Sequence, residues 1–285
     1  MQTRNYFVIT EEKQEAFNSW LKEEEKAKAT IDKYLRDIRA FSIWLGGLEA
    51  TKETAMDYKR YLLNDQGREA TGVNAVIAAL NAFFFFMDWS IKLKTLKIQR
   101  QTFRPKETEL SKEEYMRILE AANAKGNERM FLAIQTICST GIRVSELRYF
   151  TVEAACIGEV VISNKGKTRT IFMPKKLRPI LMKYINDQGI ATGCIFITRT
   201  GNPLNRSNIW TSMKNLCEAA GVEPSKVFPH NLRALFARLF YEMEKDVVRL
   251  ADVLGHSDVN TTRIYLKESG ENHRRCLDAL DLTMT

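Results

Sequence analysis

Residues 73–87 read VNAVIAALNAFFFFM, an apolar run that contains the polar Asn81. The run is too short for a membrane span, which takes about 20 apolar residues. A helix that is apolar nearly all round is buried on all sides by its neighbours. We therefore expect this segment to form the central helix of a helical bundle.

Other segments in the first part of the chain have patterns typical of amphipathic helices. The clearest is TIDKYLRDIRAFSIWLGG, residues 30–47, in which apolar residues recur at three- and four-residue spacing. Thr30 is its candidate N-cap, and the glycine pair that begins at Gly46 is its stop. Weaker patterns occur at 10–25 and 51–63. Together these patterns predict a bundle of four or five helices.

The composition limits the class of protein. The length of 285 residues favours two domains, and 45% hydrophobic with 27% charged residues suits folded domains with a buried core. The net charge of +8 favours a polyanionic partner such as nucleic acid. The five cysteines form no Cys-x-x-Cys pair, which argues against a disulfide framework and a structural zinc site. Because the N-terminus lacks the apolar core of a signal peptide, we expect a soluble, cytoplasmic protein.

A basic stretch separates the first part of the chain from the second. IKLKTLKIQRQTFRPKE, residues 91–107, has no acidic residue before its last position. We place a linker at residues 99–109, between a helical domain at 1–98 and a second domain at 110–285. The linker is either a solvated connector or part of a DNA-enclosing clamp. The candidate DNA-binding residues of this stretch are Lys92, Lys94, Lys97, Arg100, Arg104 and Lys106.

The second domain combines helices with one hairpin. Ser111 and Glu114 have the spacing of a capping box at a helix start, and a buried helix is expected to end at Gly141. EVVISNKGKTRTIFMP, residues 159–174, predicts an antiparallel hairpin with a positively charged tip. A tail helix is expected at about 271–285. The expected fold class is mainly α: a four/five-helix bundle, then a mixed α/β domain that is mostly helical and holds a small antiparallel sheet.

Four local features carry side chains suited to chemistry, and each has a structural explanation when taken alone. Arg143 in STGIRVSELRYF follows a helix-ending glycine, where a surface arginine is common. The lysines at the hairpin tip are commonly solubility charges. His230 and Arg233 lie one turn apart at a helix start, where free backbone N–H groups favour an anion. Tyr265, nine residues after His256, is by itself more typical of a buried core residue.

The order and spacing of these features resemble those of the tyrosine recombinase (phage integrase) family of site-specific DNA recombinases. The matching motifs are Thr-Gly-x-Arg-x-Ser-Glu-Leu, the lysine-tipped hairpin, His-x-x-Arg, Leu-Gly-His and a tyrosine nine residues later. The resemblance covers residues 110–270. The N-terminal helices are similar to the family's core-DNA-binding domain only in their pattern of helices, without a matching motif.

The resemblance implies a role for each matched residue. Arg143 matches the family's first catalytic arginine, and His230 and Arg233 match its His-x-x-Arg pair. His256 matches its His-or-Trp position, which would hydrogen-bond the phosphate. Tyr265 matches its nucleophile.

Two further matches concern the hairpin and an acidic residue. Lys165 matches the family's hairpin lysine best, and Lys167 is the alternative because the length of this hairpin varies. Glu146 falls where the family often has an acid that braces the site. No metal ligands are expected.

The negative charge of a phosphodiester explains why these residue types would occur together in one site. Arg143 and Arg233 would bind the non-bridging oxygens, because the planar guanidinium fits phosphate. Since no cluster of Asp and Glu accompanies them, we expect the arginines to replace a metal ion. Tyr265, with an unperturbed pKa of about 10, would attack with His230 as base, and Lys165 would protonate the leaving 5′-oxygen. The resemblance implies a 3′-phosphotyrosyl intermediate, with no metal, cofactor or ATP.

The resemblance also implies partners. They are a double-stranded DNA recombination site and a homotetramer on two DNA duplexes, with a monomer when the protein is free. In the tail, Leu277, Leu280 and Leu282 offer an apolar edge for docking on a neighbouring subunit or on the same chain. The polar stretch 257–263 is expected to be a flexible connector that lets Tyr265 approach the phosphate.

Other functions remain open from the sequence. One is a type IB topoisomerase-like or hairpin-forming resolvase activity, which uses a similar set of side chains. Another is a non-catalytic DNA-binding accessory protein. The expected source is a bacterium, a phage or a mobile element.

Overall fold

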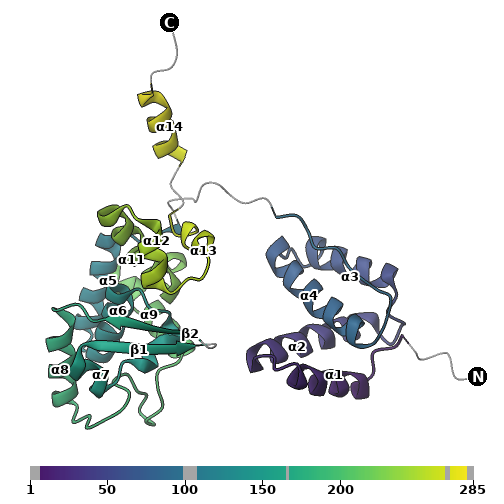
Figure 1. Ribbon diagram of the computed structural model, residues 1–285, viewed down its shortest axis with the longest axis horizontal. Coiled ribbons are helices and arrows are strands. Elements are labelled where there is room, and N and C mark those ends of the chain that lie inside the picture. The colour runs from purple at the N-terminus through teal and green to yellow at the C-terminus, as the bar shows by residue number, and fades with distance from the viewer. Residues whose placement is uncertain (1–6, 99–107, 165–166, 267–269, 281–285) are drawn as a thin grey trace, which may run out of the picture. The chain divides into compact units, whose positions relative to one another are not determined.

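Figure 1 shows the computed structural model, which describes residues 7–98, 108–164, 167–266 and 270–280. The chain divides into two units, residues 1–100 and 101–285. Most of the predicted linker lies outside the described residues, and Arg100, Arg104 and Lys106 lie there with it. The two units are described separately.

Helix α4 is the centre of the first unit. It packs against the other three helices described there, and its buried side chains include Ile77, Leu80 and Phe83. The prediction of a central apolar helix is confirmed. The helices of this unit are α1 (Glu11–Glu23), α2 (Lys28–Leu45), α3 (Lys52–Asn64) and α4 (Ala70–Phe86).

The predicted N-cap of α2, Thr30, is wrong by three residues. The helix begins at Lys28, and its N-cap is Ala27, which makes no side-chain capping bond. The carbonyl of Ala27 accepts from the backbone N–H of Thr30 at 2.7 Å, so Thr30 lies in the first turn. Lys28 and Ala29 are good helix formers, which favours a helix that begins before Thr30. The C-terminal end agrees with the prediction, since Gly46 is the C-cap.

Two asparagines of α4 fix the chain that follows the bundle. Asn81 donates from Nδ2 to the Leu93 carbonyl (2.9 Å) and accepts from the Leu93 N–H (2.8 Å). Asn74, two turns earlier, holds Leu96 in the same way at 3.0 and 2.7 Å. The two amide side chains thus form the pairs of hydrogen bonds that a neighbouring strand would form in a sheet. This arrangement leaves the side chains of Lys92, Lys94 and Lys97 exposed.

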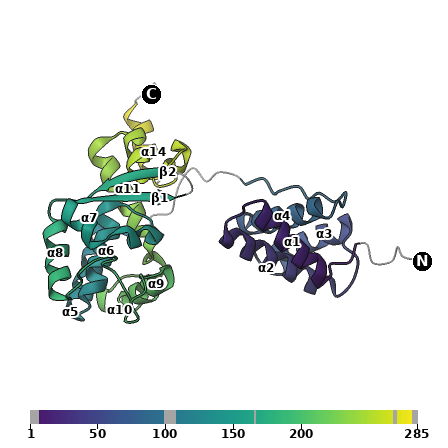
Figure 2. The same ribbon diagram turned by 60° about the horizontal axis from the view of Figure 1, so that its bottom comes forward.

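The second unit is mostly helical, and the residues described there contain one two-stranded sheet. Figure 2 shows its strands running side by side along the helices of this unit. The predicted mainly α fold class is confirmed. The elements are α5 (Lys112–Ala124), α6 (Glu128–Thr140), η2 (Val144–Tyr149), α7 (Val152–Ile157), β1 (Glu159–Asn164), β2 (Lys167–Phe172), α8 (Leu177–Asp187), α9 (Arg206–Lys214), α10 (Cys217–Ala220), η3 (Pro224–Lys226), α11 (Pro229–Glu244), α12 (Val247–Leu254), α13 (Val259–Arg263) and α14 (Gly270–Ala279).

The hairpin presents one apolar face to the core. Its strands are antiparallel, with Val160 opposite Ile171 and Ile162 opposite Arg169. Val160, Ile162 and Ile171 are buried, whereas the alternate residue Phe172 is 72% exposed. This alternation is that of a strand pair with one buried face. Arg169 is therefore a charged residue on the buried face of the hairpin, opposite Ile162.

The ends of several helices follow the sequence signals. Ser111 and Glu114 form the predicted capping box of α5, and α6 ends at Gly141. The stretch 257–263, predicted to be a flexible connector, instead contains helix α13, because the side chain of Asp258 caps its first turn by accepting from the Asn260 N–H at 2.9 Å. No helix among the described residues is long and apolar enough to cross a membrane.

The paired bonds of Asn81 predict a stability effect that can be measured. Asn81→Ala should lower the free energy of unfolding of the first unit by about 1–3 kcal/mol, because the N–H and C=O of the buried Leu93 lose their partners. Thr71→Ala, at an exposed position of the same helix, is the control and should change it by less than about 0.5 kcal/mol. Urea unfolding followed by tryptophan fluorescence measures both. Equal effects of the two substitutions would contradict this role for Asn81.

Candidate functional site

Glu146 is the buried acid of the candidate site. Its side chain is 2% exposed and lies in η2, directly after Arg143 caps that helix. The carboxylate accepts from the backbone N–H of Arg143 at 2.7 Å and from its Nη1 at 3.0 Å. Arg143 is tied down at one end of its guanidinium, while 42% of its side chain stays accessible.

Arg233 is the most deeply buried charged residue of the site. It lies in α11 and is 2% exposed. Its Nη1 donates to the Gly141 carbonyl at 2.5 Å, and its Nη2 donates to the Leu254 carbonyl at 2.8 Å. Burial, together with the nearby charges of Arg143 and Arg169, lowers the pKa of Arg233 to about 10. The group therefore stays charged at neutral pH.

His256 is held between Arg233 and Thr262. Its Nε2 lies 2.8 Å from Nη2 of Arg233, and its Nδ1 lies 2.8 Å from the Thr262 hydroxyl. Because a guanidinium only donates, Nε2 is the acceptor and the proton is on Nδ1. Burial and the charges of the surrounding arginines lower the pKa of His256 to about 4. The imidazole is therefore neutral at neutral pH.

Tyr265 lies against both histidines. Its ring centroid is 5.3 Å from that of His230 and 5.8 Å from that of His256, with which it is stacked at 11°. The tyrosine is 6% exposed and also belongs to a small apolar cluster with Leu250 and Leu254. The interpretation of Tyr265 as a packed residue is therefore confirmed, and its chemical role stays a prediction. His230 is in the first turn of α11 and is exposed.

Arg169 is a member of the cluster that the motifs did not identify. Its Nη2 lies 2.7 Å from Glu146, and its Nη1 donates to the Leu254 carbonyl, which Arg233 also uses. The sequence did contain a signal for it, since a charged residue stands in the apolar row of a predicted strand. That signal needs the register of the hairpin, which a sequence alone does not supply.

Three guanidinium groups therefore gather in one place, and two of them bind the same buried carboxylate. Arg143 and Arg169 both bind Glu146, and Arg233 shares the Leu254 carbonyl with Arg169. Each of these arginines lies close enough to the others to affect the pKa values of the cluster. The excess of positive charge, partly removed from water, makes this a site for an anion.

Most of the predicted site residues meet here, and some lie elsewhere. Lys165 and the side chain of Lys167 fall outside what the structure describes, although Lys167 begins β2. Lys92, Lys94 and Lys97 are exposed in the first unit. Among the described residues, no group of three or more His, Cys, Asp and Glu side chains could hold a metal ion.

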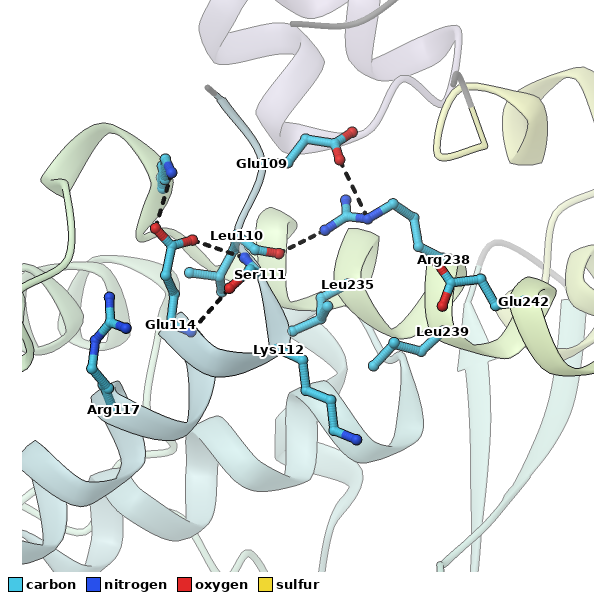
Figure 3. Close-up of a pocket in the computed structure, with 11 residues that line it drawn as sticks. Glu109, Leu110, Ser111, Lys112, Glu114, Arg117, Leu235, Arg238, Leu239 and Glu242 are labelled. Atoms are coloured by element: carbon cyan, nitrogen blue, oxygen red, sulfur yellow. Dashed lines mark hydrogen bonds and ion pairs between the residues drawn. The ribbon is translucent and has the colours of Figure 1, made fainter. Parts of the chain in front are cut away.

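A separate cavity of about 510 Å³ lies on another face of α11. Figure 3 shows Arg238 pointing to Glu109 and to the Leu110 carbonyl, at 3.5 and 2.6 Å. Leu235, Leu239 and Glu242 share this face, whereas His230 and Arg233 are spaced along a different one. None of the lining residues belongs to the arginine cluster, so this cavity is not part of the candidate site.

Comparisons of the sequence with known proteins point to one family. The family model described as "Phage integrase family" matches residues 108–272. The tyrosine recombinase XerA of Thermococcus kodakarensis is 30% identical over 278 residues, which cover 94% of this chain and 95% of that protein. The tyrosine recombinase XerH of Campylobacter jejuni is 35% identical over 168 residues, covering 55% of this chain and 47% of that protein.

Solved structures share the fold. The XerH recombinase in its post-cleavage complex with a palindromic difH substrate has a TM-score of 0.70 and 21% identity, covering 98% of this chain and 90% of that one. A lambda integrase tetramer bound to a Holliday junction has a TM-score of 0.71 and 19% identity, covering 89% and 76%. At these identities the likeness concerns the fold alone.

The protonation of His256 predicts a pH dependence of stability. The pKa of His256 is about 4 in the folded protein against an ordinary value of 6.5, so the unfolded chain binds more protons between these values. Stability should therefore fall as the pH is lowered from about 6.5 to about 4. His256→Gln keeps an acceptor for Arg233 but does not titrate, and its stability should depend less on pH. Urea unfolding of both proteins at matched pH tests this, and parallel curves would refute it.

Proposed function

The chain belongs to the phage integrase family of tyrosine recombinases, as its motifs predicted, and from this premise we propose that it is a site-specific recombinase that cuts and rejoins DNA through a 3′-phosphotyrosyl intermediate. One observation carries the proposal. Arginines converge on the buried Glu146, and Tyr265 lies beside them against two histidines.

The arginine cluster suits the scissile phosphate. Arg143 keeps part of its guanidinium accessible while Glu146 fixes its orientation. Arg233 is fixed by two backbone carbonyls and adds a second positive charge. Preorganised charges of this kind stabilise the charge that grows on the non-bridging oxygens in the transition state. In the proposed reaction the arginines do this in place of a metal ion.

Tyr265 is the proposed nucleophile and His230 its base. The phenolic oxygen forms a bond to phosphorus, the bond from phosphorus to the 5′-oxygen breaks, and the phenolic proton passes to His230. Lys165, or alternatively Lys167, supplies the proton that the leaving 5′-oxygen takes up. The phosphotyrosyl linkage keeps the energy of the broken bond, so a 5′-hydroxyl of another strand can reverse the step without ATP.

His256 acts on the phosphate through Arg233 in this proposal. Its Nε2 accepts a hydrogen bond from Arg233, and Thr262 fixes the opposite side of the ring. The predicted direct hydrogen bond to the phosphate requires Nε2 to change from acceptor to donor. Until DNA binds, the neutral imidazole orients the guanidinium of Arg233.

The first unit is proposed to bind the DNA duplex through phosphates. Lys92, Lys94 and Lys97 are exposed on a segment that two asparagines hold against α4. Such contacts position a duplex without reading its sequence and weaken with salt. The target of this unit would be the core DNA of a recombination site.

The proposed active assembly is a homotetramer on two DNA duplexes. Leu277 of α14 is 66% exposed and Leu280, which follows the helix, is 58% exposed, so the other described residues do not cover this edge. Leu282 lies outside the described residues. A lambda integrase of the same fold is a tetramer on a Holliday junction, which supports the same assembly here.

The decisive experiment traps the protein on DNA. A substrate nicked next to the cleavage position loses its short fragment after attack, so the covalent complex accumulates. The wild-type chain should form the adduct, Tyr265→Phe should bind equally well and form none, and Tyr241→Phe should behave as wild type. Tyr241 is the matched control because it packs on the same apolar cluster. Equal binding with no adduct in any variant would favour an accessory DNA-binding protein.

The contact of Tyr265 with the histidines of its own chain predicts cleavage within one subunit. Tyr265→Phe lacks the nucleophile and Arg233→Gln lacks a phosphate-binding group, so a mixture should remain inactive on the nicked substrate. Recovery of adduct formation in the mixture would instead mean that the tyrosine attacks a phosphate held by a neighbour. Gel separation of the adducts measures this.

A further inference from the structure

Arg169 is the member of the arginine cluster to which no role has been given above. Its side chain is 16% exposed, and both of its terminal nitrogens are engaged. One binds Glu146 and the other binds the carbonyl of Leu254. Each of these two nitrogens therefore already holds an acceptor of the protein.

The two partners of Arg169 are the supports of the other two arginines. Glu146 also holds Arg143, and the Leu254 carbonyl also holds Arg233. Arg169 therefore connects η2, which follows α6, with the end of α12. These segments are distant in sequence, and each one fixes a different phosphate-binding group.

The backbone beside Leu254 is shaped around this contact. Gly255 has φ 67°, a left-handed conformation, and a Cβ at this position would collide with the guanidinium of Arg169. Any other residue would thus be strained and would also displace Arg169. The next residue is His256, so the same turn sets the place of the imidazole.

Simple stability does not account for an arginine at this position. Burial and the charge of Arg143 both act against the charged form of Arg169, and Glu146 alone opposes them. An apolar residue would suit this position, which lies opposite the buried Ile162 of β1 and two residues before the buried Ile171 on the same strand. We therefore look for the role of Arg169 in the two groups that it binds, Glu146 and the Leu254 carbonyl.

We propose that Arg169 is a positioning residue that keeps Arg143 and Arg233 aligned on one phosphate by bridging Glu146 to the Leu254 carbonyl, without touching that phosphate. This inference rests on the proposed recombinase function. It adds to the matched motif residues a group outside the motifs.

The first test compares adduct formation by variants on the nicked substrate. Arg169→Gln and Gly255→Ala should each slow it by about 100-fold, the loss that a small misplacement of catalytic groups produces. The double variant should be no slower than the slower single variant, because both changes remove the same contact. Arg169→Lys should not restore the rate, since an ammonium lacks the fork that spans two acceptors. Arg117→Gln, which also loses donations to two backbone carbonyls, is the control and should match wild type.

The second test separates phosphate alignment from a general structural role. A methylphosphonate at the cleavage position removes the negative charge that Arg143 and Arg233 meet. The loss caused by Arg169→Gln, relative to wild type, should shrink by about 10-fold or more on this substrate if misplaced phosphate-binding groups cause it. Arg143→Gln is the comparison, because direct loss of a phosphate-binding group should shrink in the same way. DNA binding and thermal unfolding of each variant are measured alongside.

The outcomes distinguish the two proposals. Wild-type rates for Arg169→Gln, additive losses in the double variant, or a loss that is the same on charged and neutral substrates would each overturn the positioning role. In all of these cases the wild-type chain still forms its adduct. A wild-type chain that binds DNA and forms no adduct would refute the proposed function itself.

Discussion

The site depends on one buried carboxylate among like charges. Three guanidinium groups repel one another, and burial makes the repulsion stronger. Glu146 offsets part of it by binding Arg143 and Arg169, and the backbone carbonyls of Gly141 and Leu254 accept from Arg233. The protein thus holds positive charge in a place where water does not neutralise it fully. In the proposed reaction a phosphodiester would complete the neutralisation, and the same charges would stabilise its transition state.

The helices and the hairpin are arranged so that these groups meet. Helix α11 packs against α6, α9 and α12, and its buried face carries Arg233 to the C-terminal ends of α6 and α12. Both of those helices end at glycines with positive φ, Gly141 and Gly255. A Cβ at Gly141 would meet the Phe236 ring, and one at Gly255 would meet Arg169. The close approach of backbone to side chains therefore requires glycine at both ends, and it exposes the carbonyls that the arginines bind.

Tyr265 is surrounded by both apolar and ionisable side chains. The ring belongs to an apolar cluster formed by α11 and α12, and the same ring lies against His230 and His256. Helix α13 replaces the flexible connector expected from the polar sequence, and its buried Thr262 orients His256. The proposed nucleophile is consequently held in place by nearby elements of its own chain. This order supports attack on a phosphate bound by the same subunit.

Much of this protein could be predicted from local sequence, because helical periodicity, capping residues and turn signals act over a few residues. The central helix, the capping box at Ser111, the hairpin and the mainly α class are of this kind. The motifs also selected Arg143, Glu146, His230, Arg233, His256 and Tyr265, which the structure brings together, while their catalytic roles stay predictions. The part played by Arg169 depended on strand register, and the neutral state of His256 depended on burial beside arginines. Sequence by itself determined which elements form and which residue types are present; only tertiary structure decided which charges share a carboxylate, because that depends on contacts between segments far apart in the chain.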